Sequence, residues 1–244
     1  MAPVPRIFRK LVQIMASVTF ENLNKIYHNG FVSVKNVSLH INSGEFVTFH
    51  GPHGCGKSTI LRMIGGLEEI SSGYIFFDQL LINTVPPPNR PLAMAFQNYA
   101  LYSHLNVYEN MALGLRIRNK SRKEIEKRVH DAADFLGLSH ILHKRIRSIS
   151  EADRQQVALG RAIVCKPKVL LVDEDFSHQD ANRRKEMIVD IKRINKELGV
   201  TVLYVTNEYH EAVTVGDRVV FMEKGAILKV ESTKDIDYYS SNNR

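Results

Sequence analysis

The sequence predicts an α/β fold built on a mostly parallel β-sheet, and three observations carry this prediction. Strand-like and helix-like segments alternate along most of the 244 residues. The segments 168–175 and 201–206 are short, strongly apolar runs, which is typical of strands buried on both faces. A long helical segment near 182–198 lies between these two strands, as a crossover connection in a parallel sheet requires.

The N-terminal part of the chain carries closely spaced strand patterns. The segment 16–27 is strand-like, with apolar residues at Val18, Phe20 and Leu23. We expect an antiparallel β part at this end of the fold. Further strands are expected at 32–41, 45–50 and 74–78.

Helical patterns dominate the middle of the chain, and we expect residues 98–165 to form a helical subdomain. Ser121 and Glu124 have the spacing of a capping box at the start of a helix. The apolar residues of that helix share one face, at Ile125, Val129, Ala132 and Leu136. The other elements expected nearby are a helix at 58–67, a short buried strand at 92–96 and a helix at 106–117.

Composition excludes several classes of protein. Hydrophobic residues make up 44% of the chain, which is enough for a sizeable core and argues against overall disorder. Two cysteines cannot build a disulfide framework, and this favours a reducing compartment. No uninterrupted apolar run approaches the ~18 residues that a membrane helix needs. The formal net charge is +7, but part of it lies in the first ten residues, so we expect no nucleic-acid partner.

Residues 1–14 are basic, contain two prolines and lack the long apolar centre of a secretory signal. We expect this segment to be a flexible extension ahead of a domain that spans 15–244. Two interpretations stay open: a dispensable tail upstream of Met15, or a weakly amphipathic arm that touches an acidic surface.

The strongest motif is a glycine-rich loop between an expected strand and an expected helix. Residues 51–59 read Gly-Pro-His-Gly-Cys-Gly-Lys-Ser-Thr and fit the pattern G-x-x-x-x-G-K-[ST]. Such glycines let backbone amides approach phosphate oxygens, and the helix N-terminus adds partial positive charge. The motif predicts a P-loop NTPase core that binds ATP and Mg²⁺. Its expected nucleotide-binding residues are Gly51, His53, Gly54, Cys55, Gly56, Lys57, Ser58 and Thr59.

A nucleotide site of this kind needs a carboxylate for the magnesium shell on a neighbouring strand. Asp173 follows four apolar residues at the carboxyl end of an expected strand, where such sheets place ligands. We expect Ser58 and Asp173 to be magnesium ligands. Glu174, one residue further on, is suited to polarise an attacking water.

With these motifs in place, the sequence resembles the ATP-binding subunit of ABC transporters over most of residues 16–235. Tyr27 is similar to the aromatic residue that stacks on adenine in that family. Gln97 resembles the Q-loop glutamine, which touches Mg²⁺ or water, and Asp180 resembles the D-loop aspartate. The segments 96–118 and 158–164 are most similar to the ATPases of sugar and glycerol-phosphate importers.

This resemblance implies a function, a location and partners. The protein would couple ATP binding and hydrolysis to solute import, with carbohydrate as the expected solute. It would work with ABC transporter membrane subunits and a nucleotide-binding partner, in a homodimer or a heterodimer. We expect it to be cytoplasmic and peripheral on the inner face of the cell membrane. Importer relatives usually carry a C-terminal regulatory β-domain, which we expect to be missing here.

The family signature Leu-Ser-Gly-Gly-Gln falls on 149–153, which reads Ile-Ser-Glu-Ala-Asp. In the family this motif caps ATP held by the partner's phosphate loop, and Ser150 is the expected contact. Asp153 gives Ser150 a capping box of its own. A carboxylate ~4 Å from a phosphate charge costs about 4 kcal/mol at an effective dielectric near 20. Two interpretations stay open: a working signature, or a well-capped helix that binds no nucleotide.

Position 207 has a histidine in the family, which bonds the γ-phosphate and holds the attacking water. Asn207 can donate one hydrogen bond but carries no proton, so the rate could fall by about 10²–10⁴-fold. His53 replaces a serine, and we expect a solvated loop side chain or a pair with a partner's Asp180.

The resemblance therefore implies catalytic roles for Glu174, Gln97 and Asn207, with Glu174 as the base. We expect an ATPase whose turnover is weakened or lost. The alternative is an ATP-binding, hydrolysis-deficient regulatory or structural partner subunit. A soluble translation or DNA-repair ATPase of the same superfamily fits less well, because tandem cassettes and coiled-coil insertions do not appear in the sequence.

Overall fold

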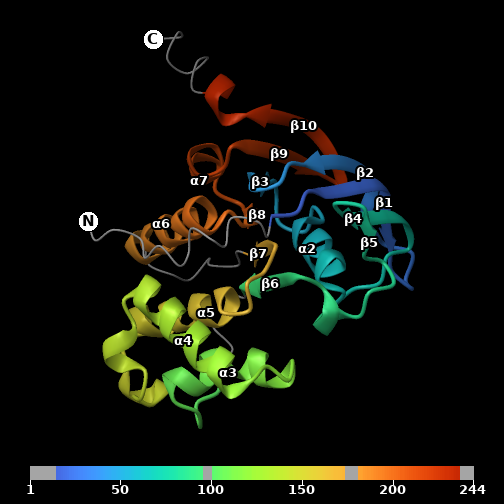
Figure 1. The fold of residues 1–244 in the computed structure, drawn as a ribbon. Coiled ribbons are helices and arrows are strands. Elements are labelled where there is room, and N and C mark those ends of the chain that lie inside the picture. The colour runs from blue at the N-terminus through green and yellow to red at the C-terminus, as the bar shows by residue number, and fades with distance from the viewer. Residues whose placement is uncertain (1–14, 96–100, 174–180, 237–244) are drawn as a thin grey trace, which may run out of the picture.

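The computed structural model describes residues 15–95, 101–173 and 181–236. Within this part of the chain the strands form two sheets, and helices pack on the larger one (Figure 1). The predicted fold class is confirmed: the fold is α/β, with an N-terminal antiparallel sheet, a largely parallel second sheet and a group of helices.

The smaller sheet is the antiparallel N-terminal part. It has four strands in the order β2-β1-β4-β5, and all of its pairings are antiparallel. The predicted strand at 74–78 is the third of them. Their bounds are β1 (Val18–Ile26), β2 (Val32–Ile41), β4 (Ser72–Phe77) and β5 (Leu80–Leu81).

The larger sheet has six strands in the order β10-β9-β3-β8-β7-β6. Its pairings are parallel except for the hairpin of β9 with β10. The central strands are the apolar runs that the sequence identified. The bounds are β3 (Phe46–His50), β6 (Leu92–Ala95), β7 (Val169–Asp173), β8 (Thr201–Thr206), β9 (Arg218–Glu223) and β10 (Ala226–Ser232).

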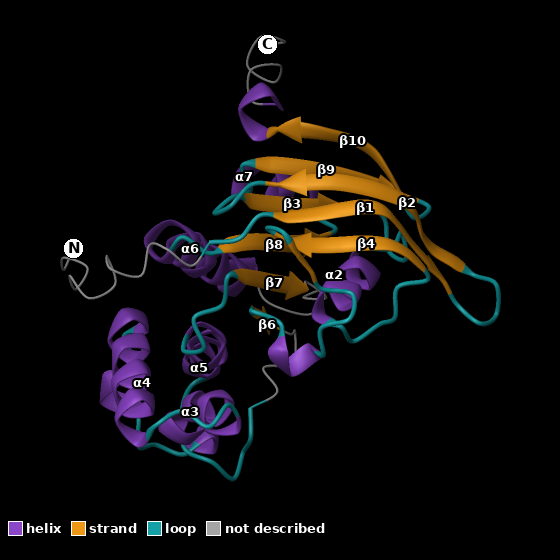
Figure 2. Ribbon diagram, turned by 45° about the vertical axis from the view of Figure 1, so that its right-hand side comes forward, coloured by secondary structure: helices purple, strands orange, loops and turns teal. Residues whose placement is uncertain are grey.

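Helices lie on both sides of the larger sheet (Figure 2). Helix α2 lies between this sheet and the small one, whereas α3, α4 and α5 gather on the other side. None of the helices described here is long and apolar enough to cross a bilayer. The α-helices are α2 (Lys57–Gly65), α3 (Val107–Ile117), α4 (Arg122–Leu136), α5 (Glu151–Ile163), α6 (Ala181–Leu198) and α7 (Tyr209–Val215), and the 3₁₀ turns are η1 (Pro87–Asn89), η2 (Ser139–Ile141) and η3 (Ile146–Ser148).

The period of two along the central strands explains why the sheet is covered on both faces. In β7, Val169 and Leu171 belong to the core shared with α2, whereas Leu170 and Val172 belong to the core shared with α3–α6. All four side chains are fully buried. A strand of this kind has no polar face, so it lies in the middle of a layered fold.

Two predicted details are corrected. The helix expected over 58–67 ends at Gly65, because Gly66 adopts a left-handed conformation (φ 72°) and its amide bonds the carbonyls of the last turn. The capping box expected at Ser121 forms only in part. The Glu124 amide bonds the Ser121 hydroxyl, but the Glu124 carboxylate pairs with Arg128 one turn further on.

Candidate functional site

Three neighbouring parallel strands end at one edge of the larger sheet. β8 lies between β3 and β7, and the register pairs His50 with Thr206 and Val205 with Asp173. The segments that follow β3 and β8, together with Asp173, therefore meet at this edge. In α/β sheets, ligands bind at the carboxyl ends of the strands.

The loop between β3 and α2 is wrapped so tightly that two of its glycines are required. A Cβ on Gly56 would lie 2.3 Å from the Ser33 carbonyl oxygen, and Gly56 has φ 105°, which favours glycine. A Cβ on Gly51 would lie 2.2 Å from the Met222 carbonyl oxygen. These contacts press the loop against β2 and β9, and so determine where α2 begins.

Lys57, the first residue of α2, points back under the loop. Its Nζ donates to the carbonyl oxygens of Gly51 (2.6 Å) and Pro52 (2.8 Å) and lies 3.6 Å from Cys55 Sγ. The side chain is only 5% exposed, so these oxygens replace the water that a lysine ammonium ordinarily holds. The positive charge of Lys57 is thereby fixed at the base of the loop.

Ser58 connects the loop to the neighbouring carboxylate. Its hydroxyl donates a 2.8 Å hydrogen bond to Asp173 Oδ1 at the end of β7. The next residue, Thr59, shares a 2.8 Å hydrogen bond with the Ser33 hydroxyl of β2. The first turn of α2 is therefore held from two sides, and the side-chain oxygens of Ser58 in α2 and Asp173 in β7 lie next to each other.

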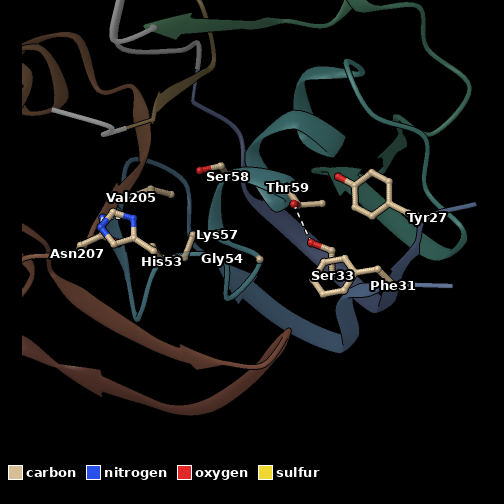
Figure 3. A pocket seen from close by; sticks show the side chains of 11 residues that line it. Tyr27, Phe31, Ser33, His53, Gly54, Lys57, Ser58, Thr59, Val205 and Asn207 are labelled. Atoms are coloured by element: carbon tan, nitrogen blue, oxygen red, sulfur yellow. Dashed lines mark hydrogen bonds between the residues drawn. The ribbon is translucent and has the colours of Figure 1, made fainter. Parts of the chain in front are cut away.

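A cavity of about 360 Å³ opens above this turn (Figure 3). Tyr27 and Phe31 lie at one end, where their rings stack with centroids 6.3 Å apart. Lys25 Nζ lies 5.0 Å from the Tyr27 ring and pairs with Glu68 at 2.7 Å. The complete lining is Tyr27, Phe31, Ser33, His53, Gly54, Gly56, Lys57, Ser58, Thr59, Val205 and Asn207.

His53 and Asn207 lie together at the end of the cavity away from the aromatic rings (Figure 3). Asn207 Nδ2 is 3.2 Å from His53 Nε2 and 3.3 Å from His53 Nδ1. His53 is exposed, as expected for a loop histidine, but this contact was not predicted. Asn207 Oδ1 is buried, and among the described residues it has no hydrogen-bond partner.

His50 lies at the end of β3, beneath the loop. Its ring contacts those of Tyr209 and Phe221 edge-on, with centroids 5.8 and 5.7 Å apart. Burial lowers the pKa of His50 below 6.5, and the charge of Lys57 lowers it further. The neutral imidazole is therefore the form that the fold favours.

The start of α5 is closed by its own side chains. The Asp153 amide donates to Ser150 Oγ at 3.0 Å, and Ser150 Oγ donates to the Asp153 carboxylate at 2.7 Å. The Ser150 amide also bonds this carboxylate, at 3.3 Å, which completes the capping box that the sequence predicted. The Ser150 hydroxyl therefore both donates and accepts a hydrogen bond within its own helix start.

The structure brings together most of the expected nucleotide-binding residues and leaves some apart. Tyr27, His53, Gly54, Gly56, Lys57, Ser58, Thr59 and Asn207 line the cavity. Gly51 and Cys55 are buried behind the loop, and Asp173 reaches the site through Ser58. Ser150 is not among the lining residues. Gln97, Glu174 and Asp180 lie outside the described residues.

Three lining residues were not predicted: Phe31, Ser33 and Val205. Val205 lies in β8, Ser33 in β2 and Phe31 directly before β2, and an aromatic residue next to a turn, at Phe31, is the only sequence signal that any of them carries. Their place in the site depends on how the two sheets meet.

Comparison with known proteins agrees with this geometry. Residues 34–177, more than half of the chain, match the family described as ABC transporter. The chain belongs to the ABC transporter family.

The curated relatives of this ABC transporter chain include importer subunits. It is 46% identical to the uncharacterized ABC transporter ATP-binding protein YurJ of Bacillus subtilis, over 93% of this chain and 62% of the relative. It is 45% identical to the maltose/maltodextrin import ATP-binding protein MalK of Photobacterium profundum, over the same shares. It is also 45% identical to the sn-glycerol-3-phosphate import ATP-binding protein UgpC of Psychromonas ingrahamii, over 91% and 60%. The chain thus spans about 60% of the length of these relatives.

Solved structures resemble the whole fold of the ABC transporter chain. CbiO1 from Clostridium perfringens, part of the ABC transporter complex cbiONQ, superposes with a TM-score of 0.83 at 27% identity, over 92% of both chains. The ATP-binding cassette MJ0796, in a dimeric post-hydrolysis state bound to ADP and Pi, has a TM-score of 0.74 at 28% identity, over 88% of this chain and 98% of that one.

Proposed function

We propose that this chain is an ATP-binding subunit of an ABC transporter and that it binds Mg-ATP in the cavity between Tyr27 and Asn207. The single observation that carries the proposal is the hydrogen bond between Ser58 and Asp173, next to the glycine-rich loop and Lys57. A hydroxyl and a carboxylate are the oxygen donors that Mg²⁺ prefers. They stand at the start of a helix, where phosphate oxygens bind.

The residues present fit the proposed ligand. Close packing at Gly56 leaves no room for a side chain, and Gly54 and Gly56 both line the cavity, so the backbone itself forms this wall of the site. Tyr27 and Phe31 offer ring faces to a base, and Lys57 offers charge to phosphates. Mg²⁺ held by Ser58 and Asp173 would neutralise part of the negative charge of the phosphates. By family resemblance, Gln97 would complete the magnesium shell and Glu174 would be the catalytic base.

We further propose that the chain serves solute import together with membrane subunits and a nucleotide-binding partner. The support comes from two relatives: MalK is a maltose/maltodextrin import ATP-binding protein, and UgpC is an sn-glycerol-3-phosphate import ATP-binding protein. The dimeric state of MJ0796 supports a paired arrangement. A subunit of this kind would lie in the cytoplasm, on the inner face of the membrane. Residues 15–244 would form its nucleotide-binding domain, with a helical subdomain near 98–165.

A second candidate is a subunit that binds ATP but hardly hydrolyses it. The closed capping box of α5 favours it, because Ser150 and Asp153 satisfy each other. A phosphate approaching this helix start would meet the Asp153 carboxylate, which repels it. Asn207 adds to the case, since an amide transfers no proton.

Phosphate release in Mg-ATP separates the two candidates. The purified protein is compared with the variant Glu174→Gln, which supplies the background. Release clearly above that background supports an ATPase that drives transport. Release equal to it, with ATP still bound, supports the hydrolysis-deficient subunit.

A variant with a restored signature motif tests whether the altered signature causes a loss of ATP turnover. Glu151→Gly, Ala152→Gly and Asp153→Gln together restore the Ser-Gly-Gly-Gln part of the family signature. If the altered signature limits turnover, the rate of phosphate release should rise by about ten-fold or more. A ten-fold rise corresponds to lowering the activation barrier by about 1.4 kcal/mol. Unchanged release would place the cause elsewhere, and Asn207→His is then the next variant.

A further inference from the structure

His53 and Asn207 lie against each other inside the cavity, although 154 residues separate them in the chain. Both depart from the family pattern described above. The parallel register of β3 with β8, which sets His50 beside Thr206, brings the two following loops together. The contact is therefore a consequence of the sheet and not of local sequence.

The position of the pair within the cavity indicates which part of a nucleotide it meets. The stacked rings of Tyr27 and Phe31 form one end, and His53 with Asn207 forms the other (Figure 3). Lys57 and Ser58 lie between them. A nucleotide whose base stacks on the rings extends its phosphates past Ser58 and Lys57. The last phosphate then reaches His53.

The chemistry of the pair suits an anion. Asn207 Nδ2 lies within reach of both ring nitrogens of His53, at 3.3 and 3.2 Å, so a small rotation of the ring leaves one nitrogen on Asn207 while the other donates to a phosphate oxygen. The amide of Asn207 serves either form of the ring. Its Nδ2 donates to an unprotonated ring nitrogen, and its Oδ1, which has no partner among the described residues, accepts from a protonated one when the amide turns over.

The exposure of the two side chains assigns them different roles. His53 is exposed in the loop and free to contact a ligand, whereas the Asn207 amide is partly buried at the end of β8. A histidine on an exposed loop has rotamer freedom that binding must remove. A hydrogen bond from the partly buried Asn207 amide removes part of this freedom before the ligand binds.

We propose that His53 contacts the terminal phosphate of a bound nucleoside triphosphate, and that Asn207 is the positioning residue that holds the imidazole there. The pair then distinguishes a triphosphate from a diphosphate. This inference rests on the proposed function, because it needs a nucleotide in the cavity.

The test compares two nucleotides in a double-mutant cycle. Calorimetry with Mg²⁺ measures the affinity for ADP and for adenylyl imidodiphosphate, a triphosphate analogue that resists hydrolysis. The proteins are the native chain, His53→Ala, Asn207→Leu and the double variant. His53→Gln tests for rescue, since its amide also donates a hydrogen bond. His140→Ala, which changes an exposed histidine outside the cavity lining, is the matched control.

The inference predicts that His53→Ala weakens binding of the triphosphate analogue by about ten-fold or more and leaves ADP affinity unchanged. Asn207→Leu should cause part of this loss in the native background and none in the His53→Ala background. His53→Gln should recover part of the affinity. Thermal unfolding of each variant confirms that the fold persists.

Equal losses for both nucleotides, no loss at all, or additive effects of the two substitutions would overturn the inference. In each of these cases the native protein still binds nucleotide, so the proposed function stands. A native protein that binds neither nucleotide overturns the proposed function and the inference with it.

Discussion

The hydroxyl of Ser58 donates a 2.8 Å hydrogen bond to Asp173 Oδ1, although 115 residues separate the two in the sequence. Ser58 lies in the first turn of α2, and Asp173 ends β7. Strand β8 separates β3 from β7, so the contact exists only because all three strands are parallel and end at one edge. This relationship connects the glycine-rich loop to a carboxylate and underlies the proposed magnesium site.

Replacing Asp173 tests that site. Asp173→Asn keeps an oxygen that can accept from Ser58 but removes the negative charge that attracts Mg²⁺. We expect the gain in ATP affinity on adding Mg²⁺ to fall by about ten-fold or more, measured by titration with and without a chelator. Asp235→Asn, at an exposed position outside the cavity, should leave the gain unchanged. A full magnesium effect in Asp173→Asn would remove this residue from the metal site.

The regular part of the fold was predictable because its signals are local. The apolar runs of β7 and β8 and the capping residue Ser150 stand out in a short window. The hairpin of β9 and β10 was not predicted. Its Lys224-Gly225 turn has positive φ at both residues, but Lys-Gly is not one of the pairs, such as Asn-Gly or Asp-Gly, that mark a two-residue hairpin in a sequence.

The phosphate-binding side of the site was also predictable, since the loop motif is contiguous. The proximity of Ser58 and Asp173 was expected from their two motifs, but the other contacts between distant segments were not. His53 meets Asn207 through the register of β3 and β8, and Ser33 meets Thr59 through the packing of β2 on α2. Such contacts depend on the arrangement of the sheets, which no single segment encodes.

The capping box of α5 should contribute measurably to stability. Ser150→Ala removes the hydroxyl that the Asp153 amide bonds, and loss of such a cap costs about 1 kcal/mol. Urea unfolding of the two proteins measures the difference in free energy of unfolding. Ser103→Ala changes an exposed turn serine and serves as control, with a change of less than about 0.5 kcal/mol. Equal stability of Ser150→Ala and the native chain would show that the box contributes nothing.

His50 should make the stability of the protein depend on pH. Its folded-state pKa is lowered from 6.5, chiefly by burial and further by Lys57. As the pH falls, His50 therefore binds a proton in the unfolded chain before it does so in the folded one. The contribution of His50 to the free energy of unfolding is complete above pH 6.5 and is lost as the pH falls toward the folded-state pKa. His50→Phe keeps an aromatic ring against Tyr209 and Phe221 but does not titrate.

The measurement is the free energy of unfolding from pH 7.5 down to pH 5.5, a range chosen about the ordinary histidine pKa. We expect the native protein to lose more stability over this range than His50→Phe does. Parallel curves for the two proteins would mean that His50 titrates equally in the folded and unfolded chains.

The central claim is that the glycine-rich loop binds the phosphates of ATP, and calorimetric titration of Mg-ATP into Lys57→Ala tests it most directly. Lys57 is the only lysine or arginine in the described cavity lining, so its loss should lower ATP affinity by about 100-fold or abolish binding. Lys224→Ala, which removes an exposed lysine outside the lining, should bind as the native chain does. Unchanged ATP affinity in Lys57→Ala would contradict the assignment of this loop.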